Sequence, residues 1–382
     1  MKKIKVMPVF GTRPDAIKMA PLILELKKCS AIDMKVCSTG QHREMLDQVM
    51  EIFNITPDYD LNIMKPRQTL ESITADILTG FKQVLIDEKP DLVLVHGDTA
   101  TCFTCALASF YSKVKCGHVE AGLRSFDKYL PYPEEMNRVL TGRMVEMHFA
   151  PTIENKNNLL REGVNQEHIY ITGNTSIDVV KKSVYSTYNF KNEFLSKYDF
   201  CNKKLITVSA HRRENIGKPL ENICHALLDI VKEHLDVELI YAVHLNPAVR
   251  EIVYPILQHE RIHLIDPLDV WDMHNLMNNS YMVITDSGGL QEEGPALGKP
   301  VLVLRNETER QEAILAGTVK LAGTQRESII KMATELISDK CKYDRMAHAV
   351  NPYGDGNASK RIVDAILYEF NLIEKRPVDF IA

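Results

Sequence analysis

Short apolar runs recur along this chain, and segments of helix length separate them. The runs lack the apolar-polar alternation of a half-exposed sheet, so each predicts a strand that is buried on both faces. A first series comprises residues 3–10, 34–39, 91–98, 115–120 and 146–151, and a second series comprises residues 169–173, 204–211, 237–244, 261–266, 281–287, 300–305 and 318–323. Alternation of such strands with helices predicts an α/β protein with two doubly wound, Rossmann-like domains.

Domain boundaries follow from the length and from one polar segment. A chain of 382 residues exceeds the size at which one core usually keeps growing. Residues 185–204 are polar and aromatic with little apolar periodicity, so the boundary is expected between about 170 and 204. We predict domains over 1–170 and 171–358, followed by a C-terminal helix within 359–382 that could pack back on the N-terminal domain.

Charge and hydropathy exclude several classes of protein. The chain has 46 Lys and Arg against 51 Asp and Glu, a net charge of −5, so we expect small-molecule partners and no nucleic acid. The first apolar run is too short for a signal peptide, and no run reaches the length of a membrane helix. We therefore expect a cytoplasmic protein that does not bind membranes.

Two closely spaced cysteines raise the question of a metal site. Cys102 and Cys105, with Cys116 and His118 downstream, could in principle ligate zinc. However, residues 99–111 have helical spacing that puts the pair on one face, and the paired spacing of structural zinc sites is missing. We predict small buried core side chains here and no metal.

The loop after the first predicted strand reads GTRPDAIKMAPL. Its single Gly11 cannot provide the three glycines of the dinucleotide fingerprint. Thr12 can cap the following helix, with Asp15 as a short form of the capping-box acid. Arg13 and Lys18 place cations near a helix N-terminus, where they oppose the helix dipole. A solvated first turn is the alternative, but an anionic ligand explains these cations better.

Two further strand ends carry ionisable residues. Asp98 follows the run 91–97, although an acid in this position often only caps the next helix. His211 stands with Arg212 and Arg213 after another predicted strand. A core histidine is the simpler interpretation, yet this combination suits phosphate contact or proton transfer.

The stretch TDSGGLQEEGPALGKPVLVL is the strongest phosphate signal. Ser287, Gly288 and Gly289 would begin a helix whose backbone N–H groups can bind an anion. Glu293 follows about one turn later and could accept hydrogen bonds from ribose hydroxyls. A tight turn alone would explain the glycines but not the neighbouring glutamates.

In this order, the loops resemble those of the non-hydrolysing UDP-N-acetylglucosamine 2-epimerases. The matching stretches are GTRPDAIKMAPL, VLVHGDTAT, GHVEAGLRS, YPEEMNR, FAPT, ITGNTSIDV, TVSAHRREN, HLNP and TDSGGLQEEGPALGKPVLVLRNETER. The resemblance implies the GT-B architecture, with the active site in the cleft between the two domains. It also implies interconversion of UDP-GlcNAc and UDP-ManNAc without NAD or metal, by elimination of UDP to a 2-acetamidoglucal and re-addition.

The resemblance assigns roles to particular residues. It makes Asp98, Glu120, Glu134 and His211 the catalytic set, in which the acids exchange protons at C2 and the histidine lies by the departing phosphate. The nucleotide would be bound by Arg13, Lys18, Met273, Ser287, Gly288, Gly289 and Glu293. Met273 stands where many relatives have an aromatic residue. The N-terminal domain would carry the acids and the C-terminal domain would bind UDP.

Family members are similar in being homodimers, and many need UDP-GlcNAc as an activator in an adjacent pocket. Gln41, Arg67 and His244 match activator-contact positions, whereas Glu44 stands where relatives often have Gln. The ManNAc units would supply a cell-envelope or capsule polysaccharide.

The acidic residues of one stretch, VEAGLRSFDKYLPYPEEMNR, are expected to have different roles. Glu120, at a strand end, and Glu134, after a proline-rich turn, are expected to transfer protons. Asp127 and Glu135 are expected to be solvated or structural, while Arg124 and Arg138 orient the loop.

Three other activities share some of these features. A GT-B glycosyltransferase would also bind a nucleotide sugar, but it would not need Asp98, Glu120 and Glu134 together. A non-catalytic nucleotide-sugar sensor would be expected to lack one of these acids or His211, and none is missing. A hydrolysing 2-epimerase releases free ManNAc. Only the similarity across the motifs distinguishes this chain from such an enzyme.

Overall fold

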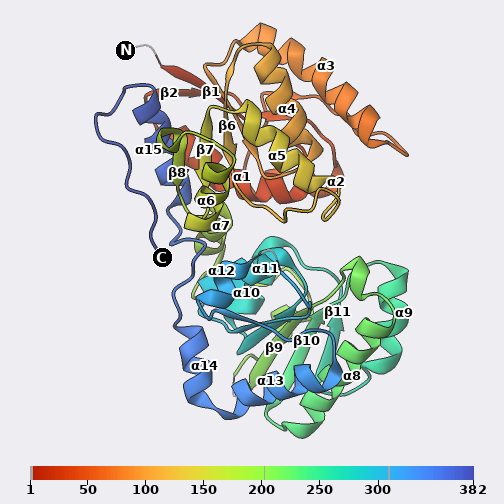
Figure 1. The fold of residues 1–382 in the computed structure, drawn as a ribbon. Helices are drawn as coiled ribbons and strands as arrows, with labels where there is room; N and C mark the ends of the chain where they lie inside the picture. The colour runs from red at the N-terminus through yellow and green to blue at the C-terminus, as the bar shows by residue number, and fades with distance from the viewer. Residues whose placement is uncertain (1–2, 202, 309) are drawn as a thin grey trace. The chain divides into compact units, whose positions relative to one another are not determined.

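The computed structural model describes residues 3–201, 203–308 and 310–382. The chain divides into two compact units, of which the first holds the residues up to Val179 together with Tyr353–Ile381 and the second holds Val180–Pro352. The boundaries that we predicted at 170 and 358 lie at different residues from these. Each unit contains a parallel sheet with helices packed on it (Figure 1).

The sheet of the first unit has the strand order β4-β3-β1-β5-β6-β7-β8, with β2 also paired to β1, and all pairs are parallel. Its strands are β1 (Ile4–Phe10), β2 (Ile32–Met34), β3 (Cys37–Ser38), β4 (Tyr59–Asp60), β5 (Leu92–His96), β6 (Lys115–Val119), β7 (Met147–Ala150) and β8 (Ile169–Ile171). Every residue of β5 and β7 is buried. This burial confirms the interpretation of the unalternating apolar runs.

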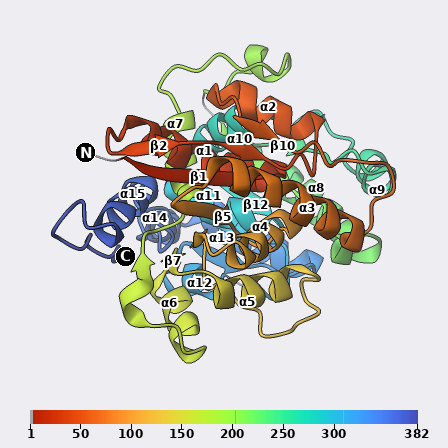
Figure 2. The same ribbon diagram turned by 90° about the horizontal axis from the view of Figure 1, so that it is seen from above.

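The helices of this unit are α1 (Arg13–Lys28), α2 (Glu44–Phe53), α3 (Leu70–Glu88), α4 (Ala100–Tyr111), α5 (Glu134–Met144), α6 (Ile153–Arg161) and α15 (Ala358–Glu369). Helix α7 (Thr175–Ser183) crosses the boundary to the second unit. Helices α3 and α4 pack on the face of β1 that carries Met7 and Val9. Cys102 and Cys105 lie buried in that core, as their helical spacing predicted. Helix α15 packs against α1 (Figure 2).

The sheet of the second unit has the order β11-β10-β9-β12-β13-β14, again all parallel. Its strands are β9 (Lys204–Ser209), β10 (Val237–Ala242), β11 (Ile262–Ile265), β12 (Met282–Thr285), β13 (Val301–Val303) and β14 (Val319–Leu321). Its helices are α8 (Lys218–Glu233), α9 (Pro247–Ile256), α10 (Val270–Asn278), α11 (Gly288–Ala296), α12 (Gln311–Leu315), α13 (Arg326–Ser338) and α14 (Lys340–Ala347). This is the Rossmann strand order, in which the order reverses between β9 and β12.

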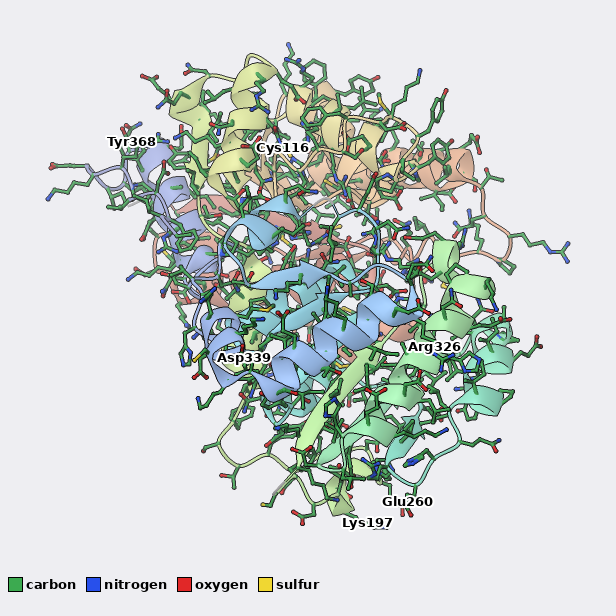
Figure 3. All side chains as sticks on the ribbon, turned by 60° about the horizontal axis from the view of Figure 1, so that its bottom comes forward. Cys116, Lys197, Glu260, Arg326, Asp339 and Tyr368 are labelled. Carbon is green, nitrogen blue, oxygen red and sulfur yellow. The ribbon has the colours of Figure 1, made fainter. Side chains whose placement is uncertain are left out.

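Side chains of α8 and α13 fill the core beneath the second sheet. Tyr241 of β10 is fully buried there, and its hydroxyl donates to the Ala210 carbonyl at 2.6 Å. Asp339 separates α13 from α14 and caps α14 by accepting from the Lys342 N–H (Figure 3). A buried tyrosine with a satisfied hydroxyl adds apolar area without an unpaired polar group.

Two strand predictions were wrong in detail. Residues 169–173 were predicted to open the second series, but Ile169–Ile171 form β8, which pairs with β7 in the first sheet. An apolar run carries no signal for the sheet it joins when the helices on either side have similar lengths. Residues 34–39 were predicted as one strand, but β2 and β3 contact different halves of β1, because the Lys35 N–H turns to the Val6 carbonyl between them.

The C-terminal residues run along β8. Ile171 donates its N–H to Asp379 Oδ1 at 3.0 Å and accepts from the Phe380 N–H at 2.7 Å. Arg376 donates to the carbonyls of Glu167 and Ile169. Among the residues described, no helix combines the length and the apolar character needed to cross a membrane.

Candidate active site

In each sheet the strand order reverses at one point, and ligands of doubly wound folds bind outside the carboxyl ends of the strands there. In the first sheet this point lies between β1 and β5, which lead into Gly11 and Asp98. In the second sheet it lies between β9 and β12, which lead into His211 and Ser287. The strand-end loops selected from the sequence therefore lie at the expected edges of both sheets.

Glu120 follows β6 in the left-handed backbone region, with φ of 67°. Its Oε2 accepts hydrogen bonds from Lys18 Nζ and from Asn174 Nδ2, the latter at 2.8 Å. Burial alone would raise the pKa of Glu120, but the Lys18 ammonium and these hydrogen bonds outweigh it and hold the pKa well below its usual range. The Nε2 atom of His96 lies 4.0 Å from Glu120 Oε2, and burial lowers the pKa of His96 to about 4. Glu120 is therefore an ionised carboxylate beside a neutral imidazole at neutral pH.

Asp98 follows β5 and is held by α5. Arg138 Nε and Nη2 donate to Asp98 Oδ2 at 3.0 and 2.6 Å, and Asn137 Nδ2 donates to the Asp98 carbonyl. Arg138 also reaches Glu135, whose buried carboxylate accepts the backbone N–H groups of residues 125 and 126. Glu135 is thus a structural residue and Arg138 orients the loop, as predicted.

Glu134 is the first residue of α5, and its Oε2 is buried without a hydrogen-bond partner among the described residues. Glu120 Oε1 lies close to Gly97: a Cβ added to Gly97 would be 3.6 Å from this oxygen. Gly97 directly precedes Asp98, which α5 holds. The three predicted acids are therefore grouped around the ends of β5 and β6 and the start of α5.

The first turn of α1 confirms the predicted cap. Asp15 Oδ1 accepts from the Thr12 N–H at 2.7 Å, and Asp15 Oδ2 accepts from the Gly11 N–H at 3.1 Å. Burial raises the pKa of Asp15 to about 6. A Cβ at Gly11 would lie 1.9 Å from Thr39 Oγ1, so this position admits no side chain. Arg13 begins the helix, and Lys18, predicted to bind nucleotide, pairs with Glu120.

His211 is positioned by a buried carboxylate. Asp286, at the end of β12, is fully buried and accepts the backbone N–H groups of His211 and Arg212 and the side-chain amide of Asn215. The His211 ring stacks on His244 with centroids 5.2 Å apart. Burial lowers the pKa of His211, although Asp286 opposes the shift. His211 is thus a neutral, partly exposed imidazole on a fixed backbone.

Gly288 and Gly289 begin α11 after Ser287, as predicted. A Cβ at Gly288 would lie 2.7 Å from Arg310 Nη1, so the guanidinium packs directly on this backbone. Arg310 is itself held by Glu292, through an Nε···Oε1 contact of 2.8 Å. Backbone N–H groups at a helix start next to a guanidinium form an arrangement that suits phosphate.

Glu293 lies one turn into α11 and contacts α10. Its Oε2 is 3.3 Å from His274 Nε2, while His274 Nδ1 and Ser183 Oγ are 2.6 Å apart. His274 is almost fully buried. The carboxylate that we predicted to bind ribose therefore has a fixed orientation.

The family model for UDP-N-acetylglucosamine 2-epimerase matches residues 24–367. The chain belongs to the UDP-N-acetylglucosamine 2-epimerase family.

Individual members of this family align along the whole chain. The UDP-N-acetylglucosamine 2-epimerase of Bacillus subtilis is 52% identical over 381 residues, which cover 100% of this chain and 99% of the relative. The structure of S. aureus MnaA with UDP has a TM-score of 0.89 and 52% identity, with 100% of both chains covered. The structure of UDP-GlcNAc 2-epimerase from Neisseria meningitidis bound to UDP-GlcNAc has a TM-score of 0.87 and 49% identity, covering 95% of this chain and 100% of that one. The fold is accordingly the two-domain, GT-B-like α/β fold that the resemblance implied.

The residues that match activator positions of the family lie in both units. In the first unit, Gln41 Oε1 accepts from Thr101 Oγ1 at 2.9 Å, and Arg67 is exposed with φ of 57°. In the second unit, His244 is exposed and stacks on His211. The side chain of Glu44 lies outside the described residues. The activator site remains a prediction.

Met273 lies on α10 and packs against the cluster around Leu195, Leu205 and Leu276. It is only partly buried. Its predicted contact with the uracil ring stays a prediction.

Sequence reasoning missed the supporting residues of this site. Asn174 and Asp286 both lie within the stretches that resemble the epimerase family, in ITGNT and TDSGG. Their position just after a buried strand was the signal that could have identified them. Their partners, Glu120 and the His211 backbone, are too distant in sequence to be predicted.

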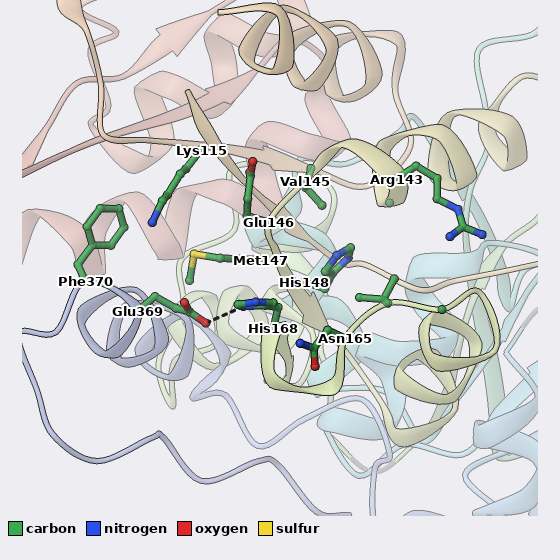
Figure 4. Close-up of a pocket in the computed structure, with 13 residues that line it drawn as sticks. Lys115, Arg143, Val145, Glu146, Met147, His148, Asn165, His168, Glu369 and Phe370 are labelled. Carbon is green, nitrogen blue, oxygen red and sulfur yellow. Dashed lines mark hydrogen bonds and ion pairs between the residues drawn. The ribbon is translucent and has the colours of Figure 1, made fainter. Parts of the chain in front are cut away.

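A cavity of about 350 Å³ lies elsewhere in the first unit (Figure 4). It is bordered by the amino ends of β6, β7 and β8, through Lys115, Glu146 and His168, and by Glu369 at the end of α15. None of the predicted site residues lines it. Within the described ranges, no group of His, Cys, Asp and Glu is arranged to hold a metal ion.

Proposed function

We propose that the protein interconverts UDP-GlcNAc and UDP-ManNAc by eliminating UDP and adding it back. The observation that carries this proposal is the ionised Glu120, which Lys18 and Asn174 hold beside Asp98 and the start of α5. A carboxylate of this kind can accept a proton. The bound UDP-GlcNAc of the Neisseria meningitidis relative supports the choice of sugar.

In the forward reaction, a carboxylate removes the C2 proton while the bond between C1 and the phosphate oxygen breaks. UDP leaves with the electron pair of that bond, and a C1=C2 double bond remains in the 2-acetamidoglucal. A second carboxyl group, which is protonated, then delivers its proton to the opposite face of C2, and the phosphate oxygen of UDP returns to C1. Proton exchange with solvent restores the first carboxyl group to its ionised form and the second to its protonated form. Asp98, Glu120 and Glu134 share these proton transfers. The cycle requires no hydride acceptor, because C2 loses and regains a proton.

Departing UDP develops negative charge that needs stabilisation. His211, Arg13 and the backbone N–H groups at Ser287, Gly288 and Gly289 provide it. Glu293 binds the ribose, and Met273 lies at the uracil.

We further propose that the protein acts as a homodimer, that UDP-GlcNAc activates it through Gln41, Arg67 and His244, and that ManNAc units are used for envelope or capsule polysaccharide. The expected cytoplasmic location stays a prediction.

Proton NMR of UDP-GlcNAc with the protein in deuterated water tests this function. Reversible formation of UDP-ManNAc with deuterium at C2 is the expected result. Free ManNAc that accumulates from the start would instead show a hydrolysing enzyme and overturn the proposal. In the reverse direction, UDP-ManNAc alone should react slowly until UDP-GlcNAc is added. A hyperbolic reverse reaction without added UDP-GlcNAc would contradict the activator site.

A further inference from the structure

Asn174 is a buried asparagine just after β8, and both ends of its amide are engaged. Nδ2 donates to Glu120 Oε2 at 2.8 Å, while Oδ1 accepts the Ser176 N–H at 3.1 Å. Only 2% of Asn174 is exposed. Because the Ser176 N–H requires an oxygen opposite it, the amide nitrogen must face Glu120. The orientation of this side chain is therefore set by the backbone.

Glu120 depends on such support. Its positive φ is unfavourable for a residue with a Cβ, so neighbouring contacts must maintain that backbone conformation. Lys18 and Asn174 both donate to Oε2, whereas no donor to Oε1 is found in the described part of the chain. Two donors thus hold one oxygen of the carboxylate and leave the other available to accept a proton.

Asn174 is in turn held by the segment that returns from the second unit. Its backbone N–H donates to the Tyr353 carbonyl at 2.6 Å. Gly173 and Gly354 are in close contact, since a Cβ at Gly173 would lie 3.1 Å from the Gly354 Cα. Asp178 accepts the backbone N–H groups of residues 358 and 359. The returning segment, residues 353–359, is therefore fastened on both sides of the Asn174 turn.

We propose that Asn174 is a positioning residue that fixes Glu120 for proton transfer, and that the returning segment fixes Asn174. The proposal rests on the proposed function, because it assigns Glu120 a proton to transfer. Loss of the amide leaves the Lys18 contact but frees the carboxylate to rotate about it. Proton transfer should then slow, while the groups that bind UDP keep their places.

Asn174→Ala is the first test, with Asn155→Ala as the matched control. Asn155 is a buried asparagine of the same unit that completes the capping box of α6 by accepting from the Thr152 N–H, and among the described residues its side chain makes no hydrogen bond to Glu120. We expect Asn174→Ala to lower kcat by about 10- to 100-fold with KM changed less than about twofold, since small misplacements of reacting groups are costly. The acid limb of its kcat/KM profile should move to higher pH. Asn155→Ala should keep the kcat and pH profile of the wild type.

A second measurement does not depend on turnover. Carbon-13 NMR of protein with labelled glutamate side chains gives the pKa of Glu120, assigned by its loss in Glu120→Gln. The pKa should rise in Asn174→Ala, because one hydrogen bond to the ionised form is removed. Unchanged values for both the Glu120 pKa and kcat would overturn the proposal.

The contact with the returning segment is tested by Gly173→Ala against Gly163→Ala. The two glycines have nearly equal positive φ, 80° and 81°, but a Cβ at Gly173 would lie 3.1 Å from the Gly354 Cα, whereas a Cβ at Gly163 would meet nothing within 4 Å. Gly173→Ala should lower kcat and raise the Glu120 pKa, and Gly163→Ala should do neither. An equal effect of the two variants would refute the role of the segment.

The two proposals can fail separately. A wild-type protein that does not exchange the C2 proton would refute the proposed function, whatever Asn174 does. A wild type that does exchange it, with an Asn174→Ala variant indistinguishable from it, would refute only the positioning role.

Discussion

Arg138 donates two hydrogen bonds to one carboxylate oxygen of Asp98, from Nε at 3.0 Å and from Nη2 at 2.6 Å. The same guanidinium donates to Glu135 through Nη1 at 3.1 Å. One buried cation therefore joins a predicted catalytic acid to the carboxylate that anchors residues 125 and 126. Only a planar, multiply donating group can make both contacts.

Replacement of Arg138 by lysine should impair catalysis. A single ammonium cannot serve Asp98 and Glu135 together, so we expect Arg138→Lys to lower kcat/KM by about 10- to 100-fold. Arg161→Lys, which changes an exposed arginine paired with Glu154, is the control and should have no effect. Steady-state rates of both variants provide the measurement. Wild-type kcat/KM in Arg138→Lys would show that Asp98 needs no such support.

The two glutamates assigned to proton transfer can be tested by isosteric replacement. Glu120→Gln and Glu134→Gln should each lower turnover by about 100-fold or more while UDP still binds, because only the proton-accepting group is removed. Deuterium incorporation at C2 and calorimetric titration with UDP measure the two properties. Asp127→Asn, in the same stretch, should retain both. A glutamate variant that exchanges C2 hydrogen at the wild-type rate would lose its assigned role.

Asp286 should stabilise the second unit. It accepts three N–H groups in a fully buried position, so Asp286→Asn turns an amide nitrogen toward donors and should lower the free energy of unfolding by about 2 kcal/mol. Urea denaturation followed by circular dichroism measures the change. Asp266→Asn alters a carboxylate that is 72% exposed and should change it far less. Equal losses in the two variants would argue against a structural role for Asp286.

Stability should depend on pH through Asp15. Its pKa is about 6 in the folded protein, against a reference value of 3.8, so the folded state binds more protons between these values. Stability therefore falls as pH rises from about 4 to 6, by about 3 kcal/mol at most, and changes no further through this group above that range. Asp15→Asn should remove that part of the slope in unfolding experiments at successive pH values. An identical slope in the variant would contradict the raised pKa.

Much of this architecture could be predicted because it depends on local patterns. Unalternating apolar runs identified the strands, and Thr12 with Asp15 identified the start of α1. The assignment of residues 169–173 to the second sheet was wrong, because the pairing of β8 with β7 depends on tertiary contacts and not on the local sequence. Sequence patterns give the elements, but not which sheet a short strand joins.

The site was predictable to a similar extent. The acids and glycines that follow strands were predicted to lie at the carboxyl edge of each sheet, and the structure places them there, because doubly wound folds bring such loops to one edge. Their roles stay predictions. From the helix dipole we predicted an anionic ligand for Lys18, whereas its partner in the structure is a carboxylate of the chain, Glu120. Nucleotide binding by Lys18 stays a prediction. Asn174 and Asp286 could not be predicted, because their roles depend on partners that only the folded chain brings near.

The residues that run along β8 have a practical meaning. An uncovered edge strand presents unpaired N–H and C=O groups that another chain can use for pairing. Here the side chains of Arg376 and Asp379 and the N–H of Phe380 occupy those groups on Glu167, Ile169 and Ile171. Removal of residues 376–382 should therefore promote self-association through β8, so fusion partners placed after residue 382 are safer than truncations before it.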